Sequence, residues 1–306
     1  MIEVEEISTI EALEALRPEW SALWDRCSSA TPFQTPEWLL PWWDSFGSGE
    51  LAVLAVRTTR LIGVGPFRIE GGVLRLLGAG ISDYLDVLIE PEHRDEAAKA
   101  MWQHLRTLPW RRFEFTDVPS GSPLLETPPA SADVGPCAVC PVVVLPAAKR
   151  RAVWRYGRHL GPIENAGSRN LEEFLDALFR LHSARWSQRG EPGVLAGAAL
   201  QTFHRRAAAG LFASGRLLLS GVRHSGSLAA VIYGFQGHRR IWTYLSGIDP
   251  SAAALSPGTV ALGLVLEQAA REGCVEADFL RGNEAYKYGW GARDRQTFRL
   301  ESRLPL

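Results

Sequence analysis

The stretch Asp-Phe-Leu-Arg-Gly-Asn-Glu-Ala-Tyr-Lys-Tyr-Gly-Trp-Gly occupies residues 278–291 and decides the predicted fold. It continues an alternating run from Val275 to Leu280, so a short strand is expected to lead into a dense group of ionisable and aromatic side chains. Lys287 is one of only three lysines in a chain with 33 basic residues. This stretch is the first candidate for a functional site. The alternative is that its aromatic side chains pack while Lys287 and Arg281 face solvent.

With 306 residues, the chain is longer than one compact core usually requires. Residues 119–136 are rich in Pro, Ser, Gly and Ala, which is typical of a connection between domains. We therefore predict an N-terminal domain over residues 1–140 and a C-terminal domain over residues 141–306.

Hydrophobic periodicity and turn residues predict the same kinds of element in both halves. In the first half we expect helices at 10–26, 36–46 and 92–108 and strands at 51–57, 61–70, 73–77, 81–89 and 112–116. In the second half we expect helices at 170–190, 200–213 and 259–272 and strands at 141–145, 216–222, 228–236, 240–248, 275–280 and 297–302. The shared plan suggests an old duplication in which one copy lost its chemistry.

Composition excludes several classes of protein. No apolar run is long enough to span a membrane and the N-terminus lacks a secretion signal, so a cytoplasmic protein is expected. The four cysteines are too few and scattered for a disulfide framework. Cys137 and Cys140 have the spacing of half a zinc site, but no second pair of ligands accompanies them, so no metal is expected.

Charge is unevenly distributed between the halves. Residues 1–140 contain 21 acidic and 11 basic side chains, a net −10, whereas residues 141–306 contain 13 and 22, a net +9. The second half should therefore favour an anionic ligand. Its basic residues are dispersed, which favours a compact phosphate-bearing cofactor over DNA.

A second candidate site is the sequence Ser-Pro-Gly-Thr-Val at residues 256–260, between a predicted strand and a predicted helix. Ser256 can cap the helix, the proline suits its first position, and Gly258 has no side chain to block a ligand. The amides of Gly258, Thr259 and Val260 would then be available to an anion. The alternative is an ordinary capped helix.

Three segments together resemble the GNAT superfamily, in the branch of cellulose-biosynthesis-associated acetyltransferase-like proteins: Tyr-Leu-Ser-Gly-Ile-Asp at 244–249, Ser-Pro-Gly-Thr at 256–259, and residues 278–287. Leu-His-Ser-Ala-Arg-Trp at 181–186 and Gly-Glu-Pro-Gly at 190–193 also resemble that branch. It is similar in plan to the Fem peptidoglycan aminoacyltransferases, which are two GNAT domains in tandem. The resemblance implies an α+β fold of two tandem GNAT-like domains, each a mixed, mostly antiparallel sheet flanked by helices, with the site in the second.

The resemblance also implies transfer of an acetyl or other acyl group from acyl-CoA to a small or polymer-attached amine, without a metal. The pyrophosphate would rest on the start of the helix after residue 256, and the pantetheine arm would bind a strand backbone. The implied cofactor-binding residues are Leu245, Ser246, Gly247, Ser256, Gly258, Thr259 and Val260. The turn departs from the superfamily's usual Gln/Arg-x-x-Gly-x-Gly/Ala loop at Leu255 and Val260.

Aminolysis of a thioester needs a neutral amine, an oxyanion stabiliser and a proton for the departing thiolate. We predict Tyr286 as the acid, assisted by Lys287, and name Asp249, Asp278 and Glu284 as candidate bases. The predicted acceptor-lining residues are His182, Arg185, Trp186 and Arg281. Asp278 could instead be a structural partner for Arg281 or Lys287, and a helix-capping or salt-bridged role remains open for His182 and Arg185.

Two alternatives remain from other classes. A Fem-type transferase would keep the fold but take its donor from aminoacyl-tRNA. A non-catalytic accessory protein of polysaccharide biosynthesis would consume no thioester. The sequence lacks a phosphate-binding Gly-x-x-x-x-Gly-Lys-Ser/Thr motif and a Gly-x-Ser-x-Gly elbow, which argues against P-loop enzymes and serine hydrolases.

Overall fold

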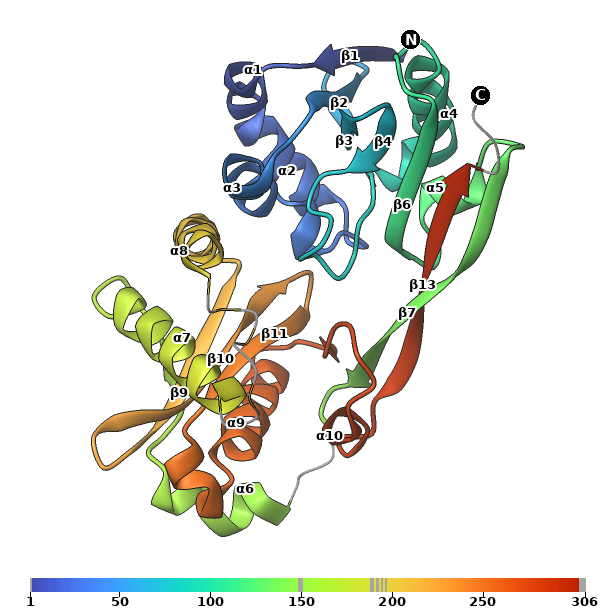
Figure 1. Ribbon diagram of the computed structural model, residues 1–306. Coiled ribbons are helices and arrows are strands. Elements are labelled where there is room, and N and C mark those ends of the chain that lie inside the picture. Colours follow the sequence, from blue (N-terminus) through green and yellow to red (C-terminus); the bar gives the residue numbers. More distant parts are fainter. Residues whose placement is uncertain are drawn as a thin grey trace. The chain divides into compact units, whose positions relative to one another are not determined.

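The computed structural model describes residues 2–147, 151–187, 190, 193, 195 and 197–302 (Figure 1). The chain divides into two compact units, Met1–Val139 with Arg295–Leu306, and Cys140–Asp294. The cut lies between Val139 and Cys140, and the C-terminal segment groups with the first unit. No helix in the described residues is long and apolar enough to cross a membrane.

The first unit contains one mixed sheet with the strand order β1-β2-β3-β4-β6-β13-β7, and β5 pairs with β3. Its core combines the sheet with α4 and is rich in aromatic rings, including Phe67, Trp102 and Phe113. The elements are β1 (Glu3–Ile7), α1 (Ile10–Ala15), α2 (Arg17–Arg26), η1 (Pro32–Gln34), α3 (Pro36–Phe46), β2 (Glu50–Arg57), β3 (Leu61–Glu70), β4 (Val73–Leu76), β5 (Leu88–Ile89), η2 (Pro91–His93), α4 (Arg94–Leu105), β6 (Arg112–Pro119), α5 (Pro123–Glu126) and β7 (Ala132–Val144).

The second unit has the strand order β7-β12-β11-β10-β9-β8. Helices α7 and α8 pack on the strands from one side and α9 from the other, with α6 against α9 (Figure 1). The elements are α6 (Arg151–Tyr156), η3 (Gly157–His159), β8 (Glu164–Asn165), α7 (Leu171–Ser187), α8 (Ala198–Ala213), β9 (Leu217–His224), β10 (Ser227–Gly237), β11 (Arg240–Ile248), η5 (Pro250–Leu255), α9 (Pro257–Arg271), β12 (Glu276–Asp278) and α10 (Ala285–Tyr288). The strand that follows them, β13 (Arg293–Ser302), belongs to the sheet of the first unit. The predicted fold class is confirmed.

Two long strands complete the sheets. The end of β7 pairs antiparallel with β12, from Val142–Asp278 to Val144–Glu276, and so belongs to the second sheet. The last strand, β13, pairs antiparallel with β6 in the first unit, where Thr297 faces Pro119. Strand pairing at long sequence separation therefore explains why the C-terminal residues group with the first unit.

Three local predictions were wrong. The predicted strand at 81–89 is irregular except for β5, because its apolar residues are buried as a packed loop in which Ser82 accepts a hydrogen bond from Trp38 Nε1 at 2.9 Å. The predicted helix at 10–26 is two helices that meet at Leu16. Within the predicted linker at 119–136, α5 and the start of β7 are regular.

Candidate functional site

In the second unit, β11 and β12 pair in parallel, from Arg240–Glu276 to Trp242–Asp278. Beyond this pairing β11 runs on to Ile248, whereas β12 ends. Strand β11 also has a bulge, because Tyr233 of β10 faces Leu245 and Gly234 faces Thr243. A bulge locally changes the direction of a strand and of its side chains. The predicted backbone-binding segment, residues 245–247, follows this bulge directly.

The loop that follows β12 is held by its own side chains. Asp278 is fully buried, and its carboxylate accepts a hydrogen bond from the Leu280 amide at 2.8 Å. Leu280 has a left-handed backbone with φ of 58°, and Gly282 has φ of 116°. A Cβ on Gly282 would lie 2.5 Å from the Glu284 carboxylate. The Asp-Phe-Leu-Arg-Gly sequence thus encodes a specific turn.

Lys287 is the central contact of this loop. Its side chain is 3% exposed and pairs with Glu284 at 2.9 Å. Its ammonium donates to the carbonyls of Leu280, Arg281 and Gly282 at 3.0, 2.8 and 3.0 Å. Three carbonyl acceptors and a carboxylate satisfy a buried ammonium. This geometry suits a residue that positions the loop more than one that handles protons.

The other predicted residues of the stretch face outwards. Arg281 and Glu284 are exposed, and Tyr286 on the short helix α10 is 50% exposed. A side chain this accessible can meet a bound substrate. Asp249, the further base candidate, accepts hydrogen bonds from the Ser251 amide and hydroxyl at 2.9 and 2.7 Å and so caps η5.

The start of α9 differs in detail from the prediction. Ser256 has a left-handed backbone and makes no side-chain cap hydrogen bond, so its expected capping role was wrong. The Val260 amide donates to the Ser256 carbonyl at 3.1 Å, which leaves Gly258 and Thr259 as the helix-start donors. A Cβ on Gly258 would collide with Ile248 Cδ1, so close packing against β11 explains this glycine.

Helix α7 lies directly against β11. A Cβ on Gly247 would lie 2.9 Å from Leu181 Cβ and 3.0 Å from the Leu178 carbonyl. The next residue of the helix, His182, is 6% exposed, and its Nδ1 lies 3.1 Å from the Ser246 carbonyl. Two predicted groups, the acceptor-side histidine and the 245–247 backbone, are therefore in contact. The side chains of Arg185 and Trp186 lie outside the described part of the chain.

A second histidine was missed by sequence reasoning. His204 of α8 is 1% exposed, and its ring centroid lies 5.5 Å from that of Tyr233 and 5.9 Å from that of Tyr244, the bulge residue. Burial, with a smaller effect of His182, lowers the pKa of His204 to about 3. Its position on the buried stripe with Ala207, Ala208 and Leu211 was the available signal.

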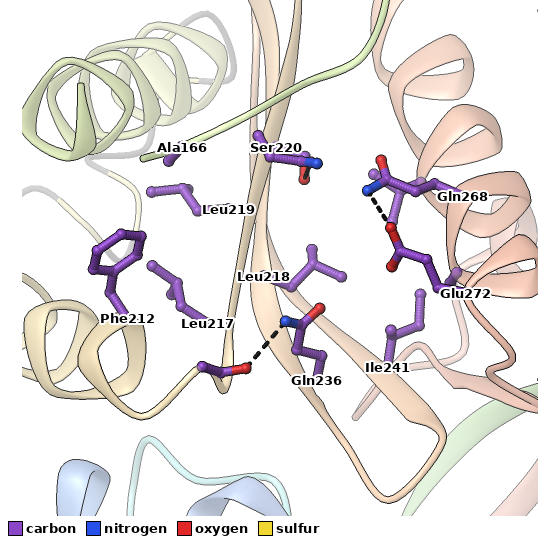
Figure 2. A pocket seen from close by; sticks show the side chains of 14 residues that line it. Ala166, Phe212, Leu217, Leu218, Leu219, Ser220, Gln236, Ile241, Gln268 and Glu272 are labelled. Atoms are coloured by element: carbon purple, nitrogen blue, oxygen red, sulfur yellow. Dashed lines mark hydrogen bonds between the residues drawn. The ribbon is translucent and has the colours of Figure 1, made fainter. Parts of the chain in front are cut away.

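A cavity of about 260 Å³ lies elsewhere in this unit, between the edge of β9 and the C-terminal half of α9 (Figure 2). Its polar side chains bond one another or the backbone: Gln268 to Glu272 at 2.8 Å, and Gln236 to the Gly215 carbonyl at 3.1 Å. Ile241 lines it, whereas Ser246 is five residues further along β11, about 16 Å away along an extended strand. The cavity is thus separate from the candidate site.

Residues 148–288, which hold β11, α9 and β12, match the family model described as the Acetyltransferase (GNAT) domain. No curated protein sequence matches the chain.

Solved structures share the fold over almost the whole chain. FemX superposes with a TM-score of 0.69 at 10% identity, covering 99% of this chain and 97% of its own. The C-terminal domain assigned to a lysylphosphatidylglycerol synthetase from Agrobacterium fabrum gives 0.66 at 12% identity, covering 95% and 92%. L-PGS from Bacillus licheniformis gives 0.64 at 11% identity, covering 96% and 91%. At these identities the likeness shows the fold alone. Residues 148–288 are thus similar to a GNAT acetyltransferase domain, and the chain shares a mixed α+β fold with these structures.

Proposed function

We propose that the second unit transfers an acyl group from acyl-CoA to the amine of an acceptor by direct attack. The observation that carries the proposal is the bulged strand β11, which parts from β12 within the segment that matches the GNAT domain and is followed by α9. The cofactor would bind along Leu245, Ser246 and Gly247, with its pyrophosphate near Gly258 and Thr259.

The rigid loop after β12 supports a reacting end at this place. Asp278 and Lys287 fix the loop from inside, so Tyr286 and Arg281 emerge from a framework with little freedom. Preorganised groups cost little reorganisation during reaction. In the proposal Tyr286 protonates the departing thiolate, Arg281 meets the acceptor, and Lys287 acts by positioning. A cytoplasmic location and a link to polysaccharide biosynthesis stay predictions.

Titration with acetyl-CoA, longer acyl-CoAs and CoA tests the donor. A donor at a hundredfold excess over its dissociation constant should stabilise the protein by about 2.7 kcal/mol, measured as a rise in melting temperature and confirmed by calorimetry. Absence of any shift at millimolar acyl-CoA would remove the CoA assignment.

Aminoacyl-tRNA is the second candidate donor, because FemX is among the structures that share this fold. Binding of charged tRNA in a gel-shift assay, without stabilisation by acyl-CoA, would favour it. Consumption of neither donor would favour the non-catalytic alternative.

Tyr286→Phe tests the proposed acid. Removing one hydroxyl from a half-exposed ring should lower kcat by about 10²-fold and leave donor affinity unchanged, since proton transfer typically contributes 10²–10⁴-fold. Tyr288→Phe, two residues along the same helix, is the matched control, because the Tyr288 hydroxyl donates to Asp294 at 2.8 Å and has no proposed role. Wild-type turnover by the Tyr286 variant would exclude this acid.

A further inference from the structure

We infer that His182 is the base that takes a proton from the acceptor amine. The inference rests on the proposed acyl transfer and deepens it, since the sequence indicated only that His182 lines the acceptor pocket. Its evidence is the contact between α7 and β11, the orientation of the imidazole, and the structural use of the competing carboxylates.

The position of His182 is fixed by backbone packing. Because Gly247 lacks a side chain, α7 can lie so close to β11 that a Cβ at this position would be 2.9 Å from Leu181 Cβ. His182 follows Leu181 and reaches the Ser246 carbonyl at 3.1 Å. The ring therefore lies beside the segment proposed to carry the donor.

The hydrogen bond selects the tautomer. A carbonyl oxygen only accepts, so Nδ1 must carry the proton in this contact. The lone pair of the neutral ring is then on Nε2, which is buried in this structure, so an acceptor amine must displace neighbouring atoms to reach it. The hydrogen bond from Nδ1 to a backbone carbonyl fixes both the tautomer and the orientation of the ring, so Nε2 stays the atom that accepts a proton.

The carboxylates predicted as bases have other bonds. Asp278 is fully buried and holds the Leu280 amide, and Glu284 pairs with Lys287. Asp249 caps η5 through Ser251. Each of these three carboxylates stabilises a loop before or after α9. Of the predicted site side chains beside β11, the His182 imidazole then remains as the base.

The neighbouring imidazole does not oppose protonation of His182. Burial keeps His204 neutral at neutral pH, with a pKa of about 3. A proton placed on His182 therefore meets an uncharged ring from α8 and the carbonyl dipole of Ser246 from β11. A second charged imidazole there would raise the energy of the protonated state.

An ammonium acceptor gives one proton to His182 Nε2, and the neutral amine attacks the thioester carbonyl. The C–N bond forms, the C–S bond breaks, and the sulfur leaves as the thiol with a proton from Tyr286. The nitrogen releases its second proton, which restores Tyr286, and His182 returns its own proton to solvent.

His182→Gln tests this role, because a glutamine can still donate to the Ser246 carbonyl but cannot store a proton. Acetyl-CoA consumption is measured with two amine probes, ethylamine, which is protonated at neutral pH, and methoxyamine, which is neutral there. We expect a loss in kcat/KM of about 10²-fold or more with ethylamine and of less than about threefold with methoxyamine.

His224→Gln is the matched control, because His224 is an exposed histidine of the same unit whose Nδ1 also contacts a backbone carbonyl, that of His159 at 3.3 Å. It should retain wild-type rates with both probes. His182→Asn is made in parallel, and the melting-temperature rise with acetyl-CoA shows which variants are folded and bind the donor.

The outcomes separate the two proposals. Equal losses with both amines would give His182 a purely structural role, and unchanged rates would give it none; either overturns the inference and leaves the proposed transfer intact. A wild-type protein that neither binds nor consumes acetyl-CoA would overturn the proposed function and the inference with it.

Discussion

Each unit contains a parallel strand pair joined through a helix. The two pairs differ in which part of the chain contacts the strand edge beyond the paired residues. In the first unit β4 and β6 pair from Val73–Arg112 to Leu74–Phe113, and α4 connects them. Before it reaches α4, the connection passes beside β6, where the Leu85 amide donates to the Asp117 carbonyl at 3.0 Å. In the second unit the corresponding connection is short, and Asp249 donates its amide to Ala229 of β10 instead.

The difference shows how one copy of a fold can lose a binding site while it keeps its sheet. The chain itself occupies the edge of β6 in the first unit, and Leu85 is part of that unit's core. In the second unit, the His182 side chain of α7 contacts the Ser246 carbonyl at the edge of β11. This supports the proposal that the second unit carries the chemistry and the first is degenerate.

Among the variants that test this comparison, Lys287→Met should cause the largest loss of stability. Methionine fills similar space but leaves three inward-facing carbonyls without their donor, and each unsatisfied buried group costs about 1–3 kcal/mol. We expect a loss of about 4 kcal/mol in the free energy of unfolding of the second unit, measured by urea denaturation. Lys99→Met, at an exposed position of α4, is the control. Equal stability of the two variants would show that the loop does not depend on the hydrogen bonds of the Lys287 ammonium.

Leu85→Ala tests the filled space in the first unit. The side chain is 3% exposed, so truncation should cost about 3 kcal/mol through lost burial and a cavity. Donor affinity should stay within about twofold of wild type. Val134→Ala, at a position that is 46% exposed, should change little. If Leu85→Ala abolished the acyl-CoA shift in a folded protein, the assignment of the site to the second unit would be wrong.

Gly247→Ala should separate α7 from β11. The new methyl group would lie 2.9 Å from Leu181 Cβ, so the helix must move, at a cost of about 2 kcal/mol. Movement of α7 should lengthen the contact between His182 and Ser246 and reduce turnover more than donor binding. Gly161→Ala is the control, because its nearest neighbour would be the Arg223 carbonyl at 3.9 Å. Unchanged turnover in Gly247→Ala would contradict a fixed imidazole.

Buried ionisable groups should give the two units opposite responses to pH. Burial raises the pKa of Asp86 in the first unit to about 7, whereas His204 in the second titrates near 3. The stabilising protonation of Asp86 is complete below about pH 4 and is lost as pH rises towards 7. The neutral His204 stabilises above about pH 6.5, and this contribution is lost as pH falls towards 3.

The measurement is melting temperature against pH for wild type, Asp86→Asn and His204→Phe. Asparagine can still accept the hydrogen bonds from Ser122 and Val87, so Asp86→Asn should remove the decline between pH 4 and 7. His204→Phe should reduce the decline in acid. Parallel curves for all three proteins would show that neither group is linked to folding.

The sequence predicted the elements that follow local periodicity. Strands β9, β10 and β11 and helix α9 lie where alternation and helix-start residues indicated. The alternating run and the ionisable and aromatic residues after it made residues 278–291 a candidate site, which stays a prediction. Packing that depends on distant partners was not predicted. Alternating apolar residues at 81–89 belong to a buried loop, and the partners of Lys287 are backbone carbonyls, which leave no sequence pattern.

Site residues divide in the same way. His182 can approach Ser246 because Gly247 has no side chain. A glycine is needed there because α7, which is distant in sequence, packs against it. His204 was passed over because a histidine on an apolar stripe has no spacing motif. The closeness of His182 and His204 to β11 can be recognised only when the positions of α7 and α8 on the sheet are known.

Strand β13 has a consequence for biosynthesis. It lies between β6 and β7, so the first sheet lacks an interior strand until residues 293–302 have left the ribosome. Strands β1 to β6 are translated long before β13, so the contacts of the first sheet close late, and such long-range closure slows folding. Expression of residues 1–140 alone should therefore yield insoluble material, and co-expression with a peptide spanning β13 should rescue it.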